Sequence, residues 1–169
     1  GIIMDVNKNS YTFLFATAMV VVVAASLSFV ATNLKPFQET NLEQEKMQSI
    51  LSSIQIPVER SEASKAFKTY IKEAIVLQEG EAVEGQDAFA IDLAKEIRKP
   101  DEKRLSPLYI AEKDGEIYYI IPLQGNGLWG PIWGYVSLKE DINTVYGATF
   151  DHKAETPGLG AEINTPIFE

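Results

Sequence analysis

The chain begins with a long apolar stretch and then changes to helical and alternating patterns. No charged residue occurs between Lys8 and Lys35, and residues 11–34 consist mainly of valine, alanine, leucine and phenylalanine. About 20 apolar residues in an α-helix are enough to cross a hydrocarbon layer of about 30 Å. Residues 11–34 therefore predict a transmembrane helix behind a short tail over residues 1–10, with the lipid bilayer as one partner of the chain.

A cleaved signal peptide is the alternative interpretation of this segment. Such a peptide has a shorter apolar region, a basic front and a small-x-small exit. Here the front carries one lysine and one aspartate, and Phe29-Val30-Ala31 is a poor exit, so an uncleaved anchor is favoured. Charge does not decide the orientation of the anchor, because Lys8 and Lys35 balance each other on its two sides.

The next two segments have helical spacing. Residues 38–56 place their apolar side chains on one face of a helix. Thr40 can cap its start, and Pro57 ends it. This pattern predicts a linker helix that packs on its own domain. Ser61 can cap a second helix that extends to about Lys72. The inner faces are Leu42, Met47, Ile50, Leu51 and Ile54 in the first helix, and Ala63, Phe67, Tyr70, Ile71 and Ala74 in the second.

From residue 74 onward the apolar positions alternate, which is typical of half-buried strands. Asp114-Gly115 favours the tight turn of an antiparallel hairpin. The charged run over residues 95–104, broken by Pro100, is expected to be a solvated loop or a short helix. Helices followed by an antiparallel meander predict an α+β domain. Strands are expected at residues 74–77, 89–93, 108–111, 117–121, 132–138 and 142–150.

Composition and charge exclude several classes of function. The chain has 169 residues, no cysteine, one histidine and a net charge of −9. Without cysteine the chain has no disulfide, no iron–sulfur ligation and no thiolate nucleophile. His152 stands in no HxxE or HExxH spacing, so neither a metal site nor an acid–base catalytic residue is predicted. The acidic excess also argues against a nucleic-acid partner.

Two glycine-containing segments are the strongest candidates for a site. In Glu155–Ala161, glycines let the backbone approach a flat or phosphorylated ligand, and Leu159 is left projecting. In Gln124–Pro131, backbone amides can bind phosphate, and Leu128 and Trp129 can cover a ring system. The alternatives are a plain turn for the first segment and a wide hairpin loop, with Trp129 in the core, for the second.

Together these features carry a resemblance to a known family. The anchor, the hairpin over residues 108–123 and the two glycine-containing segments resemble the FMN-binding domain family. The chain is most similar to the C subunits of the Na+-translocating NADH:quinone oxidoreductase, and the resemblance covers nearly the whole chain. The G subunit of the Rnf complex is the nearest alternative. The Gly-Leu-Trp-Gly-Pro-Ile-Trp-Gly run, Gly127–Gly134, favours the quinone reductase.

The resemblance implies FMN as cofactor and a set of residues that line it. In the family, a flavin transferase joins FMN by a phosphoester to a threonine of a Ser/Thr-Gly-Ala-Thr motif beyond the Pro-Gly-Leu-Gly loop. Such a motif does not follow the loop here, so the FMN-binding domain, residues 61–169, is expected to be incomplete at its C-terminus. Gly147-Ala148-Thr149 precedes the loop and follows Tyr146, so it fits the interior of a strand better. The noncovalent wall is expected to comprise Thr156 and Leu159 first, then Glu155, Gly158 and Gly160, and less directly Leu128 and Trp129.

The function implied by the resemblance is that of a membrane-anchored electron carrier in an NADH:ubiquinone reductase. FMN carries the electrons, and the protein holds and shields the ring, so no catalytic residue is expected. The implied partners are other membrane, flavin and iron–sulfur subunits of the same complex. The implied location is the bacterial inner membrane, with a single span, a linker helix over residues 35–60 and a periplasmic domain. The alternative is a nonenzymatic anchored assembly module in which the glycine segments are only turns.

Overall fold

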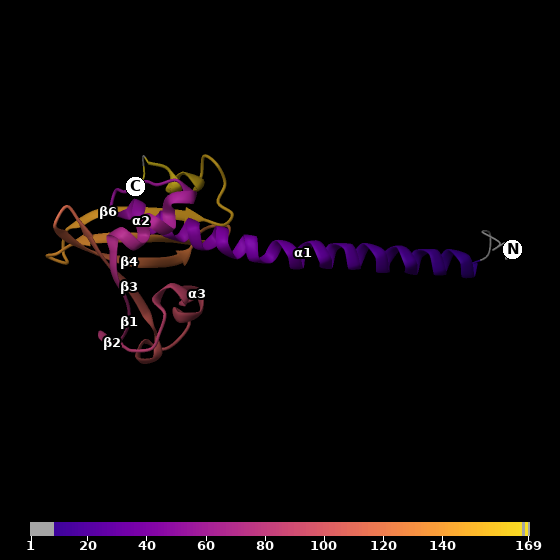
Figure 1. Ribbon diagram of the computed structural model, residues 1–169, viewed down its shortest axis with the longest axis horizontal. Helices are drawn as coiled ribbons and strands as arrows, with labels where there is room; N and C mark the ends of the chain where they lie inside the picture. The colour runs from indigo at the N-terminus through magenta and orange to yellow at the C-terminus, as the bar shows by residue number, and fades with distance from the viewer. Residues whose placement is uncertain (1–8, 167, 169) are drawn as a thin grey trace. The chain divides into compact units, whose positions relative to one another are not determined.

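The computed structural model describes residues 9–166 and residue 168 (Figure 1). The chain divides into two compact units, one that ends at Glu43 and one that starts at Gln44. α1 (Asn9–Ser53) is a continuous helix of 45 residues that contributes to both units. The elements of the second unit that follow α1 are η1 (Arg60–Glu62), α2 (Ala63–Tyr70), β1 (Ile71–Gln78), β2 (Glu81–Val83), η2 (Ala88–Ala90), α3 (Leu93–Glu96), η3 (Asp101–Lys103), β3 (Ser106–Lys113), β4 (Glu116–Asn126), β5 (Pro131–Lys139), β6 (Val145–His152) and η4 (Ala161–Asn164).

The first unit consists mainly of an apolar helix. An 18-residue window of α1 has a mean hydropathy of 2.4, and none of that window is buried. The side chains of Thr17, Ser26, Thr32 and Asn33 each donate a hydrogen bond to the carbonyl oxygen four residues earlier. A hydrocarbon environment offers such groups no other partner. Length, hydropathy and these internal bonds are consistent with a single membrane anchor.

The predicted start of a separate helix at residue 38 is wrong. α1 continues through Pro36, and Thr40 lies inside the helix, where its hydroxyl donates to the carbonyl oxygen of Pro36 at 3.0 Å. A proline removes a single backbone donor, and here the helix continues past it. Leu42, expected on the inner face, is exposed, whereas Ile50 is fully buried. Only the last turns of α1 therefore pack on the domain.

The second unit is built on one antiparallel sheet of six strands in the order β2-β1-β3-β4-β5-β6. The strands β3 to β6 form a meander, as predicted. Asp114 and Gly115 join β3 to β4 with φ values of 55° and 80°. Positive φ at both central residues is what the tight hairpin turn requires. Helices and an antiparallel sheet in one unit confirm the α+β fold class.

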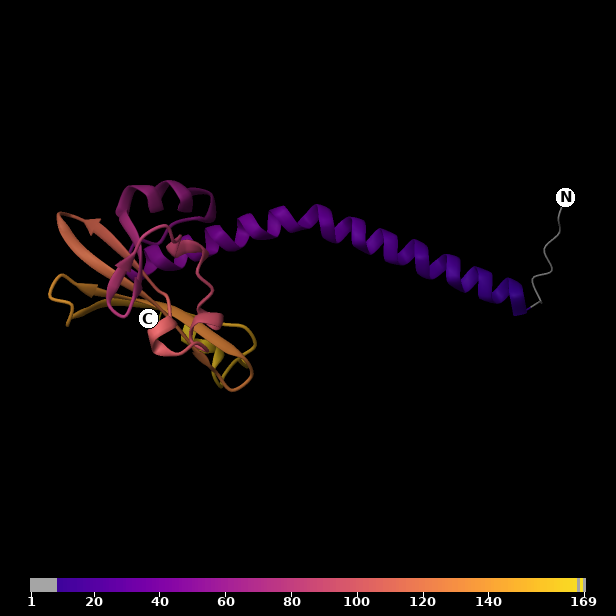
Figure 2. The same cartoon turned by 90° about the horizontal axis from the view of Figure 1, so that it is seen from below.

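The hydrophobic core lies between one face of the sheet and the helices. Tyr109 of β3 and Ile120 of β4 are fully buried, and they belong to the same cluster as Ile50, Leu51 and Ile54 at the end of α1. Figures 1 and 2 show α2 on the same side of the sheet as the last turns of α1. Burial alternates along the middle of β3, as the period of two in a strand requires.

Hydrogen bonds fix the end of α1 to the sheet. The hydroxyl of Thr149 donates to the carbonyl oxygen of Ser49 at 3.0 Å, and that of Ser137 donates to Ser53 at 2.5 Å. The last four carbonyl groups of a helix have no intrahelical i to i+4 partner, and the strand side chain of Ser137 satisfies that of Ser53 here. Gly147 adjoins the same helix end, because a Cβ built on it would lie 2.4 Å from the carbonyl oxygen of Ser53.

The predicted strand over residues 89–93 is wrong. The short helices η2 and α3 occupy this region instead. The carboxylate of Asp87 accepts the backbone N–H of Phe89 at 2.9 Å. Such a local side-chain bond competes with strand pairing, and it starts the turn in which the carbonyl oxygen of Asp87 accepts the N–H of Ala90.

The second helix is shorter than predicted at both ends. Ser61 lies in η1, and α2 has no side-chain cap. The helix ends at Tyr70 and does not reach Lys72, because Ile71 already pairs with β3. A β-branched residue favours the strand at this junction.

The last predicted strand starts later than expected. β6 begins at Val145, whereas Ile142 has a φ of 49° and lies in the turn before it. The carboxylate of Asp141 accepts the N–H groups of Asn143 and Thr144 and closes this turn. This Asx-type turn lies between β5 and β6. Residue 142 therefore belongs to the turn and not to a strand.

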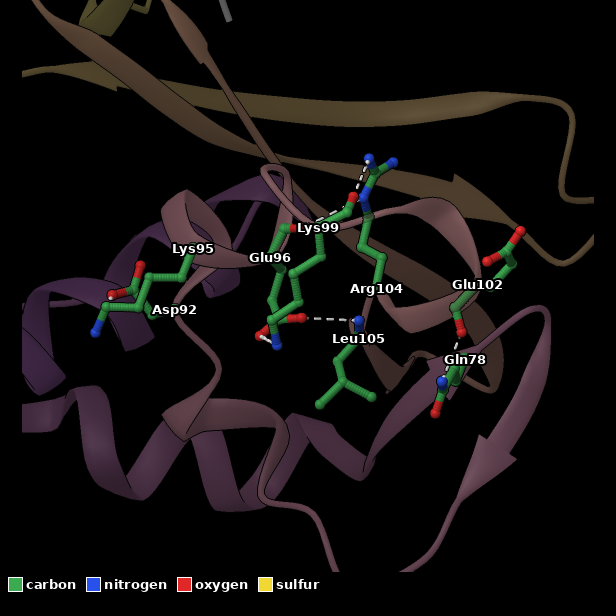
Figure 3. Close-up of polar contacts among 8 residues, drawn as sticks. All are labelled: Gln78, Asp92, Lys95, Glu96, Lys99, Glu102, Arg104 and Leu105. Atoms are coloured by element: carbon green, nitrogen blue, oxygen red, sulfur yellow. Dashed lines mark hydrogen bonds and ion pairs between the residues drawn. The ribbon is translucent and has the colours of Figure 1, made fainter.

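The charged run over residues 95–104 forms short helices and an ion pair between the buried carboxylate of Glu96 and the exposed side chain of Lys99. Figure 3 shows the carboxylate of Glu96, which is buried, against the ammonium of Lys99 at 2.7 Å and the backbone N–H of Leu105 at 3.0 Å. The pKa of Glu96 lies below its ordinary value of 4.5, mainly because Lys99 donates a hydrogen bond to its carboxylate. Arg104 donates to the carbonyl oxygens of Glu96 and Lys99. The cluster fixes the approach of the chain to β3.

Candidate functional site

The hairpin loop between β4 and β5 is shorter than predicted. Residues 124–126 belong to β4 and pair with residues 131–133 of β5, so the loop is Gly127–Gly130. The N–H of its first residue donates to the carbonyl oxygen of its last at 2.7 Å. Leu128 is 76% exposed and Trp129 is 64% exposed, so Trp129 does not fill the core.

The second candidate segment forms a compact turn after β6. The carbonyl oxygen of Thr156 accepts the N–H groups of residues 159–161 at 3.0–3.2 Å. Gly158 has a φ of +79°, a conformation that glycine adopts without the cost other residues meet. Its N–H donates to the carboxylate of Glu162 at 2.5 Å. The turn presents Leu159, which is 79% exposed.

Glu155 joins the two segments. Its carboxylate accepts the backbone N–H of Trp129 at 3.1 Å. A Cβ built on Gly127 would lie 2.1 Å from one oxygen of this carboxylate, and one on Gly160 would lie 2.8 Å from the other. Glycine at both positions therefore leaves the space that the carboxylate occupies. The N–H of Glu155 donates to Nδ1 of His152 at 3.2 Å, which ties this backbone to the end of β6.

The predicted site residues thus lie in two loops that meet at one end of the sheet. Leu128, Trp129 and Leu159 are large apolar side chains that these two loops expose to solvent, and apolar side chains exposed on adjoining loops are candidates for a binding surface. Apolar side chains beside glycine backbone suit a flat ring system. The residues present therefore fit the ring of a flavin.

Three residues support these loops in roles that the sequence does not indicate. Gly127 makes room for the carboxylate of Glu155, Glu162 holds the turn, and His152 accepts a backbone N–H. Glu162 follows Gly158 by four residues, and this spacing is the one local signal that could have indicated it. The other two roles depend on the register of the strands.

Several backbone amides of the two loops already have acceptors within the chain. The N–H of Gly127 reaches Gly130, that of Trp129 reaches Glu155, and those of residues 158–161 reach Glu162 or Thr156. An anion nest requires several N–H groups that point freely toward one ligand. These amides therefore differ from the open phosphate-binding loop that the sequence suggested.

Thr149 and one cavity lie apart from the two glycine loops. Thr149 is buried in β6, and its hydroxyl donates to α1. A cavity of about 420 Å³ lies at the opposite end of β4 and β5 from the glycine loops, and there the Tyr118 hydroxyl donates to Glu116 at 2.6 Å. Among residues 9–166 and 168, no three metal-ligating side chains gather. The cavity is lined by Glu116, Ile117, Tyr118, Lys139, Glu140 and Asp141.

Comparison with known proteins points to the same loops. The family model of the FMN-binding domain matches residues 127–168, a range that contains both loops. The C subunit of the Na(+)-translocating NADH-quinone reductase from Neisseria meningitidis serogroup A is 34% identical over 183 residues, which cover 98% of this chain and 71% of the relative. The corresponding protein from Pseudomonas aeruginosa is 31% identical, with 95% of this chain and 70% of the relative covered.

Solved structures agree with these relatives. The crystal structure of the C subunit from Parabacteroides distasonis has a TM-score of 0.74 and 48% identity, over 80% of this chain and 66% of that chain. Shewanella oneidensis NqrC, at 19% identity and a TM-score of 0.61, shares the fold. This chain spans about 70% of the length of the curated relatives. Its identity and coverage confirm the predicted resemblance, and the chain belongs to the family of C subunits of the Na+-translocating NADH-quinone reductase.

Proposed function

We propose that this chain is a membrane-anchored flavoprotein subunit that relays electrons through FMN within a Na+-pumping NADH:quinone oxidoreductase. The observation that carries the proposal is the meeting of two glycine loops through Glu155, with three exposed apolar side chains around them. The family of the chain and the match to the FMN-binding domain over residues 127–168 support it.

The proposed roles of the residues follow from this geometry. Leu128, Trp129 and Leu159 would cover the isoalloxazine ring and exclude water from it, and the glycines would let the backbone approach its face. Thr156 orders the turn that presents Leu159. FMN, when bound, supplies the electron-carrying chemistry. No catalytic residue and no metal ligand of this chain is assigned.

The proposal extends to the attachment of FMN and to the complex. The phosphoester that a flavin transferase forms in the family is not assigned to this chain, because Thr149 is buried and bonded to α1. The partners would be the other membrane, flavin and iron–sulfur subunits. Residues 11–34 would anchor the chain in the bacterial inner membrane, with residues 61–169 on the periplasmic side. An anchor without intramembrane charge offers an ion no path, so sodium would cross through other subunits.

Flavin binding to the chain in detergent micelles tests the proposal. FMN is titrated while the quenching of tryptophan and flavin fluorescence is followed. Leu159→Ser removes apolar contact with the ring, and we expect FMN binding to weaken about tenfold, because losing about 1.4 kcal/mol of apolar burial has this effect. Ile142→Ser is the matched control, since Ile142 is 67% exposed in the turn at the other end of the sheet. Its FMN affinity should equal that of the unchanged chain.

Two results would contradict the proposal. If the unchanged chain binds no FMN, or if both variants bind equally well, the loops are not a flavin wall, and the assembly module is favoured. The covalent link is tested separately on the native full-length protein in a denaturing gel under ultraviolet light. A band without flavin fluorescence would contradict that link.

A further inference from the structure

We infer that His152 is a positioning residue whose neutral imidazole, together with Glu155, holds the two loops of the proposed flavin wall against each other. The inference rests on the proposed function and adds the residues that set the geometry of that wall. It also names the protonation state of His152 in which the loops are held.

Two hydrogen bonds in series connect the end of β6 to the loop between β4 and β5. Nδ1 of His152 accepts the backbone N–H of Glu155 at 3.2 Å, and the carboxylate of Glu155 accepts the backbone N–H of Trp129 at 3.1 Å. The first bond fixes the backbone of the residue whose side chain makes the second. We call these two bonds together the His152–Glu155 link.

The space around the carboxylate of Glu155 makes its position sensitive to this backbone. A Cβ built on Gly127 would lie 2.1 Å from one carboxylate oxygen, and one built on Gly160 would lie 2.8 Å from the other. The carboxylate therefore lies against the backbone of both loops. If the backbone of residue 155 moves, the carboxylate loses its contact with one loop or the other, and the apolar side chains that the loops present move apart.

Only a neutral imidazole can make the first bond of the link. A ring nitrogen accepts a hydrogen bond through its lone pair, so Nδ1 carries no proton and the ring N–H lies on Nε2. The imidazolium has a proton on both nitrogens and accepts no hydrogen bond. Protonation of His152 therefore sets a ring N–H against the N–H of Glu155, and the link breaks.

The charged groups around His152 belong to other titration ranges. Histidine ordinarily ionises between about pH 5 and pH 8, whereas carboxylates and lysine ordinarily ionise well outside this range. Ile132 and Trp133, which lie opposite the end of β6, carry no charge, and neither does the loop Gly127–Gly130. The charged groups on β6, on the turn after it and on η4 that lie nearest in the sequence are the carboxylates of Asp151, Glu155 and Glu162 and the ammonium of Lys153.

NMR of the full chain in detergent micelles tests the link directly. The chain is labelled with nitrogen-15 and carries no histidine tag, so His152, the one histidine of the sequence, gives the only imidazole signals. At about pH 8 we expect the ring to be in the Nε2–H form. As the pH falls from about 8 to about 5.5, the amide signals of Glu155 and Trp129 should shift with the same midpoint as the imidazole.

Two substitutions separate the acceptor from the charge. His152→Leu has no acceptor, whereas His152→Asn places a side-chain oxygen at the position of Nδ1 and cannot ionise. At about pH 8 we expect His152→Leu to bind FMN about fivefold more weakly than the unchanged chain, the effect of one hydrogen bond, and His152→Asn to restore most of this affinity.

The pH dependence of FMN binding is measured as a ratio, because the phosphate of FMN itself ionises at about pH 6. At about pH 5.5 we expect the unchanged chain to bind about three- to fivefold more weakly than His152→Asn does. Asn143→His added to His152→Asn is the matched control, since it places an imidazole in the exposed turn at the other end of the sheet. Its FMN affinity should equal that of His152→Asn at both pH values.

The outcomes separate this inference from the proposed function. If the amide of Glu155 does not follow the imidazole, or if the folded His152→Asn and His152→Leu variants bind FMN equally well, the inference is overturned while flavin binding stands. Circular dichroism verifies folding, and if His152→Leu does not fold, the ratio at about pH 5.5 decides. If the unchanged chain binds no FMN at any pH, the proposed function fails, and the NMR titration alone supports or overturns the link.

Discussion

Gly147 is the position at which one added methyl group best tests the seating of α1 on the sheet. A Cβ there would lie 2.4 Å from the carbonyl oxygen of Ser53, and real Cβ contacts almost never fall below 3.0 Å. The oxygen belongs to the backbone, and the hydroxyl of Ser137 holds it at 2.5 Å. In Gly147→Ala the helix end must therefore move by at least about 0.6 Å.

Two costs set the size of the effect. Overpacking at a close contact costs about 1–3 kcal/mol. Loss of the hydrogen bond from Ser137 to Ser53 costs about 1 kcal/mol, the low end of the range for a buried group. The cost is at this end because the Ser137 hydroxyl can still donate to the carbonyl oxygen of residue 147, at 3.2 Å. Gly147→Ala is therefore expected to lower the free energy of unfolding by about 2–4 kcal/mol.

Urea unfolding of the chain in detergent, followed by tryptophan fluorescence, measures this change. Gly125→Ala is the matched control, because a Cβ on Gly125 would meet only side-chain atoms of Ile132 at 3.7 and 3.9 Å, which is ordinary contact. Its free energy of unfolding should stay within about 0.5 kcal/mol of the unchanged chain, or rise slightly. If Gly147→Ala behaves like this control, the end of α1 does not lie on β6 as described.

The remaining predictions concern titration. Lys99 holds the pKa of Glu96 below its ordinary value of 4.5, so the stabilisation by ionised Glu96 is complete above about pH 4.5 and is lost as the pH falls through the lowered pKa. Between about pH 5 and pH 2, the unchanged chain should therefore lose stability more steeply with falling pH than Glu96→Gln does, as followed by circular dichroism. Equal pH profiles for the two proteins would refute the ion pair. Burial raises the pKa of Tyr109 and Tyr135, and a hydrogen bond to a neighbouring carboxylate raises that of Tyr118. Tyrosinate absorbance should therefore show these three side chains ionising only when the fold opens, and early ionisation of all seven tyrosines would contradict this.

The central strands could be predicted because local and tertiary signals agree there. Residues 108–111 and 117–121 alternate in the sequence, and Asp114-Gly115 sets the turn between them. Each face of the hairpin then meets the environment that its residues favour. The fold class follows from this meander and from the helical spacing before it.

Other boundaries were missed because a single side chain decided them. Asp87 binds the N–H of Phe89 and directs residues 89–93 into short helices, although their apolar pattern fits a strand. At Pro36 the opposite occurs, since the helix continues through a residue that usually ends one. Neither outcome can be derived from the periodicity of apolar residues alone.

The candidate site was predictable in its residues and not in its geometry. The glycines and Leu159 mark the segment after β6 in the sequence itself. The bond between Glu155 and Trp129 spans 26 positions, and it forms only because the pairing of β5 with β6 brings the two loops to one end of the sheet. Which amides remain free for a ligand therefore depends on strand register.

The bonds between the sheet and the end of α1 also have a mechanical meaning. The carbonyl oxygens of Ser49, Ser53 and Ile54 accept hydrogen bonds from side chains on three different strands, β6, β5 and β3. A pull on the chain at Gln44 would load these bonds together with the buried side chains beside them. The last turns of α1 are therefore fixed in the domain by several strands at once. A force on this end would have to disrupt the hydrophobic core before the helix could detach from the sheet.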